Sequence, residues 1–259
     1  MYTPSKKRFV ELIIYGKNPV SELLINPSSE IEEIFIYGDR SRNDTSEVLK
    51  TAKSKGIKIS TLSKEELSKL CQTNSHQGIA ARIKDFEYHK LADIIARAKE
   101  KGDQLCLVLL DHIEDPQNLG AIIRTVDVLG GHGVVIPKDR AASVTPAVIK
   151  ASAGAVNHVL ISRVVNLGAV IRDLKKQGVW IVGADSSSTK SVHQEDFKNL
   201  DIALVIGNEG KGLGHKIKSE CDFLVSIPQT GKVSSLNASV AAGIMIYEIM
   251  RQKITTSNG

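Results

Sequence analysis

Apolar and polar residues alternate along the first third of this chain in two kinds of pattern. Short apolar stretches at 8–15, 34–37 and 57–60 are separated by amphipathic stretches whose apolar positions recur every three or four residues. The first pattern is typical of β-strands and the second of α-helices. We therefore predict a small unit of alternating strands and helices over residues 8–84, large enough to form a domain of its own.

Local signals mark where some of these helices begin and end. Ser63, followed by Glu66, is a capping box that opens one helix, and Gly56 ends the helix before it. Residues 85–103 are rich in charge and have apolar positions at helical spacing. They predict a connecting helix or linker after the first unit.

The rest of the chain, residues 104–255, carries a longer alternation whose strands are apolar almost throughout. Continuous apolar strands separated by helices indicate a parallel sheet that is covered on both faces. The predicted strands are Leu105–Leu110, Gly133–Ile136, Val156–Ile161, Val179–Val182, Ile202–Ile206 and Phe223–Ile227. The predicted helices lie near residues 119–129, 145–153, 167–177, 213–220 and 237–252. The predicted fold class is α/β, with a smaller N-terminal domain followed along the chain by a parallel-sheet domain.

Composition excludes several classes of protein. With 259 residues, 42% hydrophobic and 24% charged, the chain is an ordinary globular one. It has no apolar run of about 18 residues, so we expect no transmembrane helix, and its first residues lack the apolar core of a signal peptide. The three cysteines, Cys71, Cys106 and Cys221, are far apart and indicate neither a disulfide framework nor a zinc site. They suit a reducing cytoplasm.

The net charge of +5 is distributed unevenly. Residues 1–101 hold 18 Lys and Arg against 14 Asp and Glu, which leaves little excess for the remainder. The first unit is therefore the better candidate for contact with a polyanion such as RNA, although the same excess also fits simple solubility.

Three loops rich in Gly, Asn and Ser follow predicted strands of the second unit. They are DHIEDPQNLGAIIR at 111–124, GNEGKGLG at 207–214 and PQTGKVSSLNAS at 228–239. Ligands of open α/β sheets bind beyond the carboxyl ends of the strands, so three such loops on one edge predict a binding site. The glycine order in 207–214 is not the dinucleotide fingerprint, and residues 230–233 do not complete a phosphate loop. Both observations disfavour a dehydrogenase and a nucleotide hydrolase.

Each polar residue of these loops also has a purely structural interpretation. Asn118 fits the N-cap of the helix at 119–129, Arg124 a solvated surface cation, and Glu209 an exposed loop acid. The serines and Asn237 fit caps of the last helix, and the glycines fit tight turns. Taken singly, these residues leave both interpretations open.

Taken together, the three loops resemble the three motifs of SpoU-type RNA ribose 2′-O-methyltransferases. The patterns are N-x-x-x-x-x-R-T at 118–125, I-G-N-E-G-x-G-L at 206–213 and I-P-x-x-G-x-V-S-S-L-N-x-S-V-A at 227–241, in the family's order. Residues 16–20, GKNPV, and 76–79, HQGI, resemble the family's small RNA-binding domain, which is similar to ribosomal protein L30. The resemblance covers nearly the whole chain.

This resemblance implies an L30-like RNA-binding domain over 8–84, a linker over 85–103 and a SPOUT methyltransferase domain with a trefoil knot over 104–255. It also implies a homodimer. The branch with this N-terminal domain implies a guanosine ribose in the peptidyl-transferase loop of 23S rRNA as the substrate. The alternatives are a tRNA guanosine 2′-O-methyltransferase and a non-catalytic RNA-binding or ribosome-assembly protein.

The resemblance further implies S-adenosylmethionine (AdoMet) as the cofactor, and no metal. The implied cofactor-binding residues are Gly207, Asn208, Gly212, Ile227, Pro228 and Leu236. The implied catalytic residues are Asn118, Arg124, Glu209, Ser235 and Asn237. A guanidinium does not lose its proton near neutral pH, so we assign Arg124 as a fixed cation rather than a base. In that role it grips the phosphate beside the target ribose and stabilises the developing alkoxide.

Overall fold

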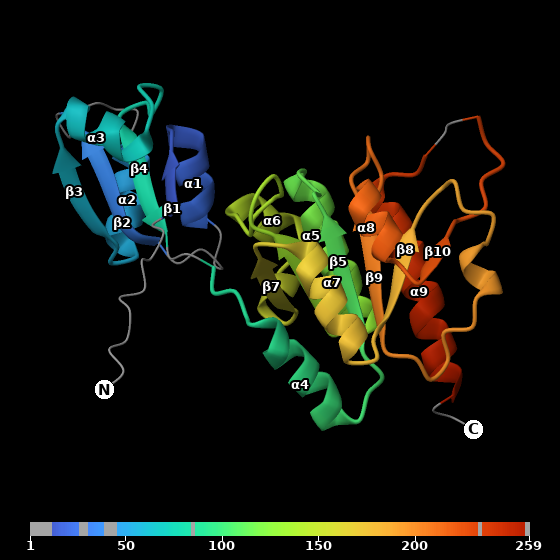
Figure 1. Cartoon of the computed structure of the whole chain (residues 1–259). Coiled ribbons are helices and arrows are strands. Elements are labelled where there is room, and N and C mark those ends of the chain that lie inside the picture. The colour runs from blue at the N-terminus through green and yellow to red at the C-terminus, as the bar shows by residue number, and fades with distance from the viewer. Residues whose placement is uncertain (1–11, 26–30, 39–45, 84–85, 233–234, 257–259) are drawn as a thin grey trace, which may run out of the picture. The chain divides into compact units, whose positions relative to one another are not determined.

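The chain folds into two compact units, Met1–Glu87 and Tyr88–Gly259, each with a sheet of its own (Figure 1). The computed structural model describes residues 12–25, 31–38, 46–83, 86–232 and 235–256. Among the helices within these ranges, none is both long enough and apolar enough to cross a membrane.

The first unit is a four-stranded sheet with helices on both faces. Its strands are β1 (Leu12–Tyr15), β2 (Ile31–Tyr37), β3 (Lys58–Leu62) and β4 (Ile79–Ile83), in the order β1-β4-β2-β3. Its helices are α1 (Lys17–Ile25), α2 (Ser46–Ser54) and α3 (Lys64–Cys71). β4 runs antiparallel to β1 and β2, whereas β2 and β3 are parallel. Helices α1 and α2 pack on one face of the sheet and bury one apolar core, and α3 packs on the other face and buries a second.

The helix boundaries of this unit follow the predicted signals. The hydroxyl of Ser63 accepts a hydrogen bond from Glu66 N at 3.2 Å, and the Glu66 carboxylate accepts one from Ser63 N at 2.8 Å, which confirms the capping box. Gly56 follows α2 with a positive φ of 68°, as expected of a glycine that ends a helix. Residues 8–11 of the predicted first strand lie outside the described residues.

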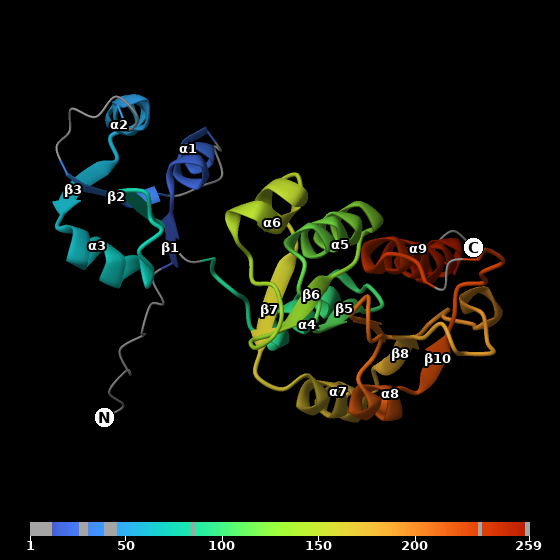
Figure 2. The same ribbon diagram turned by 90° about the horizontal axis from the view of Figure 1, so that it is seen from above.

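The second unit is a six-stranded parallel sheet between two layers of helices (Figure 2). Its strands are β5 (Cys106–Asp111), β6 (Gly133–Pro137), β7 (Leu160–Val164), β8 (Trp180–Ala184), β9 (Ile202–Gly207) and β10 (Phe223–Val225), in the order β10-β8-β9-β5-β6-β7. Its helices are α4 (Leu91–Lys101), α5 (Pro116–Leu129), α6 (Pro146–Ala151), α7 (Leu167–Lys176), α8 (His215–Glu220) and α9 (Ala238–Thr256), with short 3₁₀ turns η1 (Ala155–Asn157) and η2 (Val192–Gln194). Helices α4, α7 and α8 cover one face, and α5, α6 and α9 the other.

The helix within the predicted connection, α4, belongs to the second unit. Its apolar residues Ile94, Ile95 and Ala98 are buried in the same core as the apolar face of α7. Gly102 ends it in the left-handed conformation. The chain from Tyr88 onward is therefore part of the parallel-sheet unit.

The strand predicted at Val156–Ile161 is wrong in its first half. β7 begins only at Leu160, because Ala153 and Gly154 take positive φ values of 51° and 89° and lead into the 3₁₀ turn η1. Val156 is buried all the same, so its apolar character reflects burial and not strand geometry.

Helix α5 begins three residues earlier than predicted, and this changes the interpretation of Asn118. Asp115 is the N-cap, since its carboxylate accepts a hydrogen bond from Gln117 N at 3.0 Å, and Pro116 occupies the first turn. The structural interpretation of Asn118 as the N-cap is therefore wrong. Asn118 lies inside the first turn, 7% exposed, with its side chain available for contacts outside the helix.

The last helix, α9, packs against α5 and β9. Near its end, Gln252 accepts a hydrogen bond from Phe197 N at 2.8 Å and donates one to the carbonyl of Glu195 at 3.1 Å. The buried Lys253 donates to the carbonyls of Leu105 and Leu200, at 3.0 and 2.6 Å. α9 thus packs against both α5 and the connection from β8 to β9.

Candidate active site

The loop after β9 forms a tight turn at the edge of the sheet. Gly212 N donates to the carbonyl of Asn208 at 2.8 Å, and Gly210 N donates to Asn208 Oδ1 at 3.0 Å. A Cβ atom on Gly207 would overlap the backbone of Gly212, so only glycine fits there unless the loop moves. Asn208 Nδ2 also donates to the carbonyl of His112 at 3.0 Å, which ties the loop to the end of β5.

Asp111, the last residue of β5, holds the far end of the same loop. Its Oδ2 accepts a hydrogen bond from Gly214 N at 2.8 Å, and its Oδ1 lies 2.7 Å from His112 Nδ1. These contacts account for a carboxylate that is only 3% exposed. Within the described part of the chain, no three His, Cys, Asp or Glu side chains are grouped so that they could hold a metal ion.

Three of the predicted catalytic residues form one chain of hydrogen bonds. Asn237 Nδ2 donates to Asn118 Oδ1 at 2.9 Å, and Asn118 Nδ2 donates to Glu209 Oε1. The three residues come from the three motif loops, so the fold brings together what the sequence separates. Each amide donates to the next residue of the chain, and the last acceptor is the carboxylate of Glu209, an exposed residue.

Asn237 serves two roles at once. Its Oδ1 accepts a hydrogen bond from Ser239 N at 2.9 Å at the start of α9, as the structural interpretation expected. Its Nδ2 remains free to reach Asn118. Because the helix start fixes Asn237, it also fixes the orientation of the Asn118 amide and, through it, of Glu209.

A cleft of about 440 Å³ opens along the carboxyl ends of β8, β9 and β10. Sites for small ligands usually have volumes of roughly 300 to 1,000 Å³, so this cleft has the size of a cofactor site. The predicted residues in its wall are Gly207, Asn208, Glu209, Gly212, Ile227, Ser235 and Leu236. Ala241 and Met245 of α9 add apolar surface to it.

Four predicted residues lie outside the wall of this cleft. Asn118 and Asn237 are two of them, and they connect to it only through their hydrogen bonds to Glu209 and to each other. Pro228 is exposed beside Ile227. Arg124 is exposed on α5, six residues after Asn118, which places it about 9 Å along the helix axis and on a different side. It has no hydrogen-bond or ion-pair partner among the described residues.

The cleft also contains residues that the sequence patterns did not single out. Ala184 is the last residue of β8, Asp185 and Ser186 follow it, and Lys218 comes from α8. The rule that applied to the other loops applies here too, because β8 is a neighbour of β9 and its carboxyl end lies on the same edge. The sequence Asp-Ser-Ser at 185–187, which begins three residues after the end of the predicted strand Val179–Val182, was the signal that could have found them.

Comparison with known proteins decides the family. The model of the SpoU rRNA Methylase family matches residues 104–247, and that of RNA 2′-O ribose methyltransferase substrate binding matches residues 13–89. The chain belongs to the SpoU rRNA methylase family. A protein of Bacillus subtilis strain 168 assigned to the TrmH family of tRNA/rRNA methyltransferases is 42% identical over 244 residues, which cover 93% of this chain and 95% of that protein. A Staphylococcus aureus protein with the same assignment is 39% identical over 94% of this chain and 97% of its own length.

Solved structures agree with this assignment. The SpoU methyltransferase AviRb of Streptomyces viridochromogenes is 28% identical, with a TM-score of 0.62 over 95% of this chain and 91% of that one. A complex of AviRb with AdoMet matches equally well, at 27% identity and a TM-score of 0.62. An AdoMet-bound rRNA methyltransferase of Sinorhizobium meliloti is 25% identical, with a TM-score of 0.60 over 93% of this chain and 87% of that one.

The matches confirm the predicted fold class, in which a substrate-binding domain is followed along the chain by a SPOUT methyltransferase domain with a parallel sheet. The family is one of AdoMet-dependent RNA methyltransferases, as the resemblance implied.

Proposed function

We propose that this protein transfers a methyl group from AdoMet to the ribose 2′-hydroxyl of a guanosine in the peptidyl-transferase loop of 23S rRNA. The observation that carries the proposal is the hydrogen-bonded chain from Asn237 through Asn118 to Glu209, which ends in the wall of a cleft of cofactor size. The match of the first unit to a substrate-binding model supports an RNA substrate. Three free cysteines support a reducing, cytoplasmic site of action.

The residues of the cleft fit AdoMet. Gly212 has open space where a side chain would stand, so its main chain is open to close approach by the cofactor, and Gly207 allows the tight turn that places Gly212 there. Ile227 and Leu236 offer apolar surfaces for the two faces of the adenine ring, and Leu236 is 37% exposed. When bound, AdoMet supplies a methyl group already activated by its positive sulfur, so the protein needs chiefly to orient the acceptor.

The polar residues then act on the ribose hydroxyl. Glu209 is held by Asn118, and its carboxylate accepts a hydrogen bond from the ribose hydroxyl and so orients that hydroxyl. Arg124 grips the neighbouring phosphate and stabilises the negative charge that develops on the attacking oxygen. Its exposed place outside the cleft suits contact with RNA, which approaches from solvent. Ser235 and Asn237 shape the methionine end of the cofactor site.

We also propose that the protein acts as a homodimer through α5 and α9, which pack side by side. Four large apolar residues on these helices are exposed: Val128 (74%), Tyr247 (56%), Val240 (49%) and Ile244 (39%). Exposed apolar residues gathered on two adjacent helices mark an interaction surface. Val128 lies one turn from Arg124 on α5, so Arg124 borders this surface and is placed to complete the site of a partner subunit.

Replacing both Val240 and Ile244 with glutamate is expected to convert the dimer into monomers of 28.1 kDa, because charges would be buried without partners in the interface. Sedimentation velocity measures the change. Val165→Glu is the matched control, since Val165 is 79% exposed and lies on neither helix. A wild-type protein that sediments as a monomer would contradict the proposed dimer.

The proposed reaction is tested by supplying methyl-labelled AdoMet with unmodified 23S rRNA and, separately, with total tRNA. We expect label in 23S rRNA at one guanosine, and resistance of the adjacent phosphodiester to alkali because the 2′-oxygen is blocked. Mass spectrometry of nuclease fragments locates the nucleotide. Label in tRNA alone would favour the tRNA enzyme, and RNA binding without transfer would favour the non-catalytic protein.

A further inference from the structure

Asp185 lies in the wall of the cleft directly after β8. Its backbone is fixed, since Asp185 N donates to the carbonyl of Val225 in β10 at 2.9 Å. One carboxylate oxygen, Oδ1, accepts hydrogen bonds from Ser187 N and Ser187 Oγ, both at 2.9 Å. The other, Oδ2, forms an ion pair with Lys218 Nζ. The carboxylate is therefore held in one orientation at the edge of the cofactor cleft.

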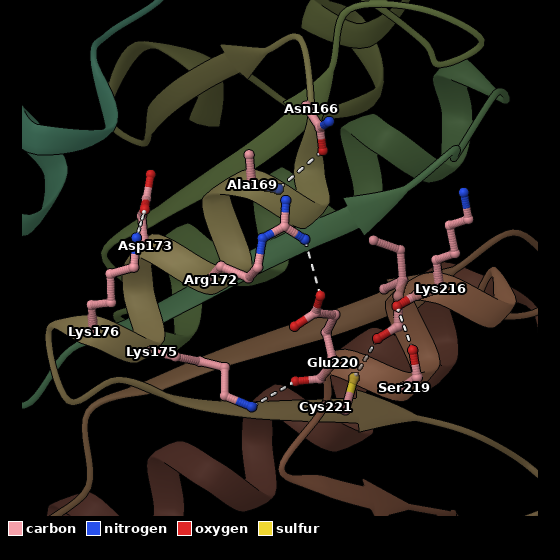
Figure 3. A network of polar contacts seen from close by, with 11 residues as sticks. Asn166, Ala169, Arg172, Asp173, Lys175, Lys176, Lys216, Ser219, Glu220 and Cys221 are labelled. Atoms are coloured by element: carbon pink, nitrogen blue, oxygen red, sulfur yellow. Dashed lines mark hydrogen bonds and ion pairs between the residues drawn. The ribbon is translucent and has the colours of Figure 1, made fainter.

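Helix α8, which carries Lys218, is anchored to α7 by contacts with Glu220 (Figure 3). Arg172 of α7 donates to Glu220 Oε1 at 2.9 Å, and Lys175 donates to the carbonyl of Glu220 at 3.0 Å. Lys218 Nζ also donates to Ser187 Oγ at 3.2 Å. The ion pair is thus a fixed part of the cleft wall.

The carboxylate of Asp185 is ionised at neutral pH and has acceptor capacity left. Burial alone would raise the pKa of Asp185, but the hydrogen bonds from Lys218 and from the backbone and hydroxyl of Ser187 outweigh it and hold this pKa below its ordinary value. Oδ2 is buried beside Lys218, so it is closed to a ligand. A donor on a ligand in the cleft would therefore bind this carboxylate at Oδ1, alongside the two hydrogen bonds from Ser187.

Given the proposed cofactor, the order of the strand ends indicates which part of AdoMet would meet this group. The reacting methyl would lie by Glu209, which is held by Asn118 from beyond β5, and the adenine would lie by Ile227, just after β10. The ribose joins these two parts, so it lies between them, where β8 and β9 end. Its vicinal hydroxyls are O–H donors of the kind that a carboxylate binds strongly, whereas the adenine and the sulfonium carry no hydroxyl. We infer that Asp185 binds the ribose hydroxyls of the cofactor and that Lys218 is its positioning residue.

Binding of S-adenosylhomocysteine and of 5′-methylthioadenosine to the Asp185→Asn variant tests this inference by calorimetry. The second compound keeps the adenine, ribose and sulfur but lacks the amino acid. We expect both to bind about 10- to 100-fold more weakly than to the wild type, by similar factors, because a charge-assisted hydrogen bond is lost from a part they share. A loss for S-adenosylhomocysteine alone would assign Asp185 to the methionine ammonium, and no loss for either would leave the ion pair purely structural; both results overturn the inference.

Two further measurements guard against a variant that misfolds. The unmodified protein should bind the 2′-deoxy or the 3′-deoxy form of methylthioadenosine at least about 10-fold more weakly than the parent compound, and equal affinities would overturn the inference. Asp173→Asn, an exposed carboxylate of α7 outside the cleft, is the matched control and should leave all affinities unchanged. Wild-type protein that binds no S-adenosylhomocysteine at all would contradict the proposed cofactor itself. Tight wild-type binding that Asp185→Asn does not alter would contradict only the ribose contact.

Discussion

Replacing Arg124 with alanine is expected to slow methyl transfer by about 10²- to 10³-fold while changing the affinity for S-adenosylhomocysteine less than about twofold, because it removes one stabilising positive charge from the transition state. Arg124 is exposed, has no partner among the described residues and does not line the cleft, so the cofactor site does not depend on it. Single-turnover transfer from labelled AdoMet measures the first quantity and calorimetry the second.

Two variants sharpen the interpretation of that result. Arg97→Ala removes an exposed arginine from α4, on the opposite face of the sheet, and should leave transfer unchanged. Arg124→Lys keeps the charge but loses the planar fork that binds phosphate through two hydrogen bonds, so we expect partial activity. A parallel fall in cofactor affinity would make Arg124 a structural residue, and undiminished transfer would exclude it from the mechanism.

Strands and helices were predictable from the sequence wherever their burial alone determined which positions are apolar. Strands buried on both faces, such as β5 and β9, are apolar at nearly every position, and their predicted and observed limits differ by one residue. The start of β7 was not predictable in this way. Val156 is apolar because it is buried in a 3₁₀ turn, and burial without periodicity does not distinguish a turn from a strand.

Only those residues of the candidate site that belong to a sequence motif were predictable. The loops that carry Asn118, Glu209 and Asn237 stood out by composition and resemblance, and the structure joins all three. Their hydrogen bonds were not predictable, because a cap and a catalytic group use the same residue types, and Asn237 is in fact both a cap and a member of the chain. Asp185 matches no motif, and only the order of the strands places it in the cleft.

Replacing Gly207 with alanine is expected to weaken S-adenosylhomocysteine binding by at least about 100-fold and to abolish measurable transfer. The added Cβ overlaps the backbone of Gly212, and backbone cannot rotate away as a flexible side chain can. The loop must therefore shift, and it carries Asn208 and Glu209 with it. Overpacking of this kind costs about 1 to 3 kcal/mol, which lowers the thermal midpoint by several degrees and leaves the protein folded. Calorimetry of binding and of unfolding measures both effects.

Gly210→Ala separates a steric cause from a general sensitivity of the loop. Its Cβ would lie 3.5 Å from Asn208 Oδ1, an ordinary contact, and Gly210 is not among the glycines with positive φ. The same added methyl group, three residues further along the same loop, should therefore leave cofactor binding close to wild type. If both variants lost binding equally, the loop would be intolerant of any side chain and the close approach at Gly207 would not be the reason. If Gly207→Ala bound the cofactor normally, the backbone turn at the end of β9 would have no part in forming the site.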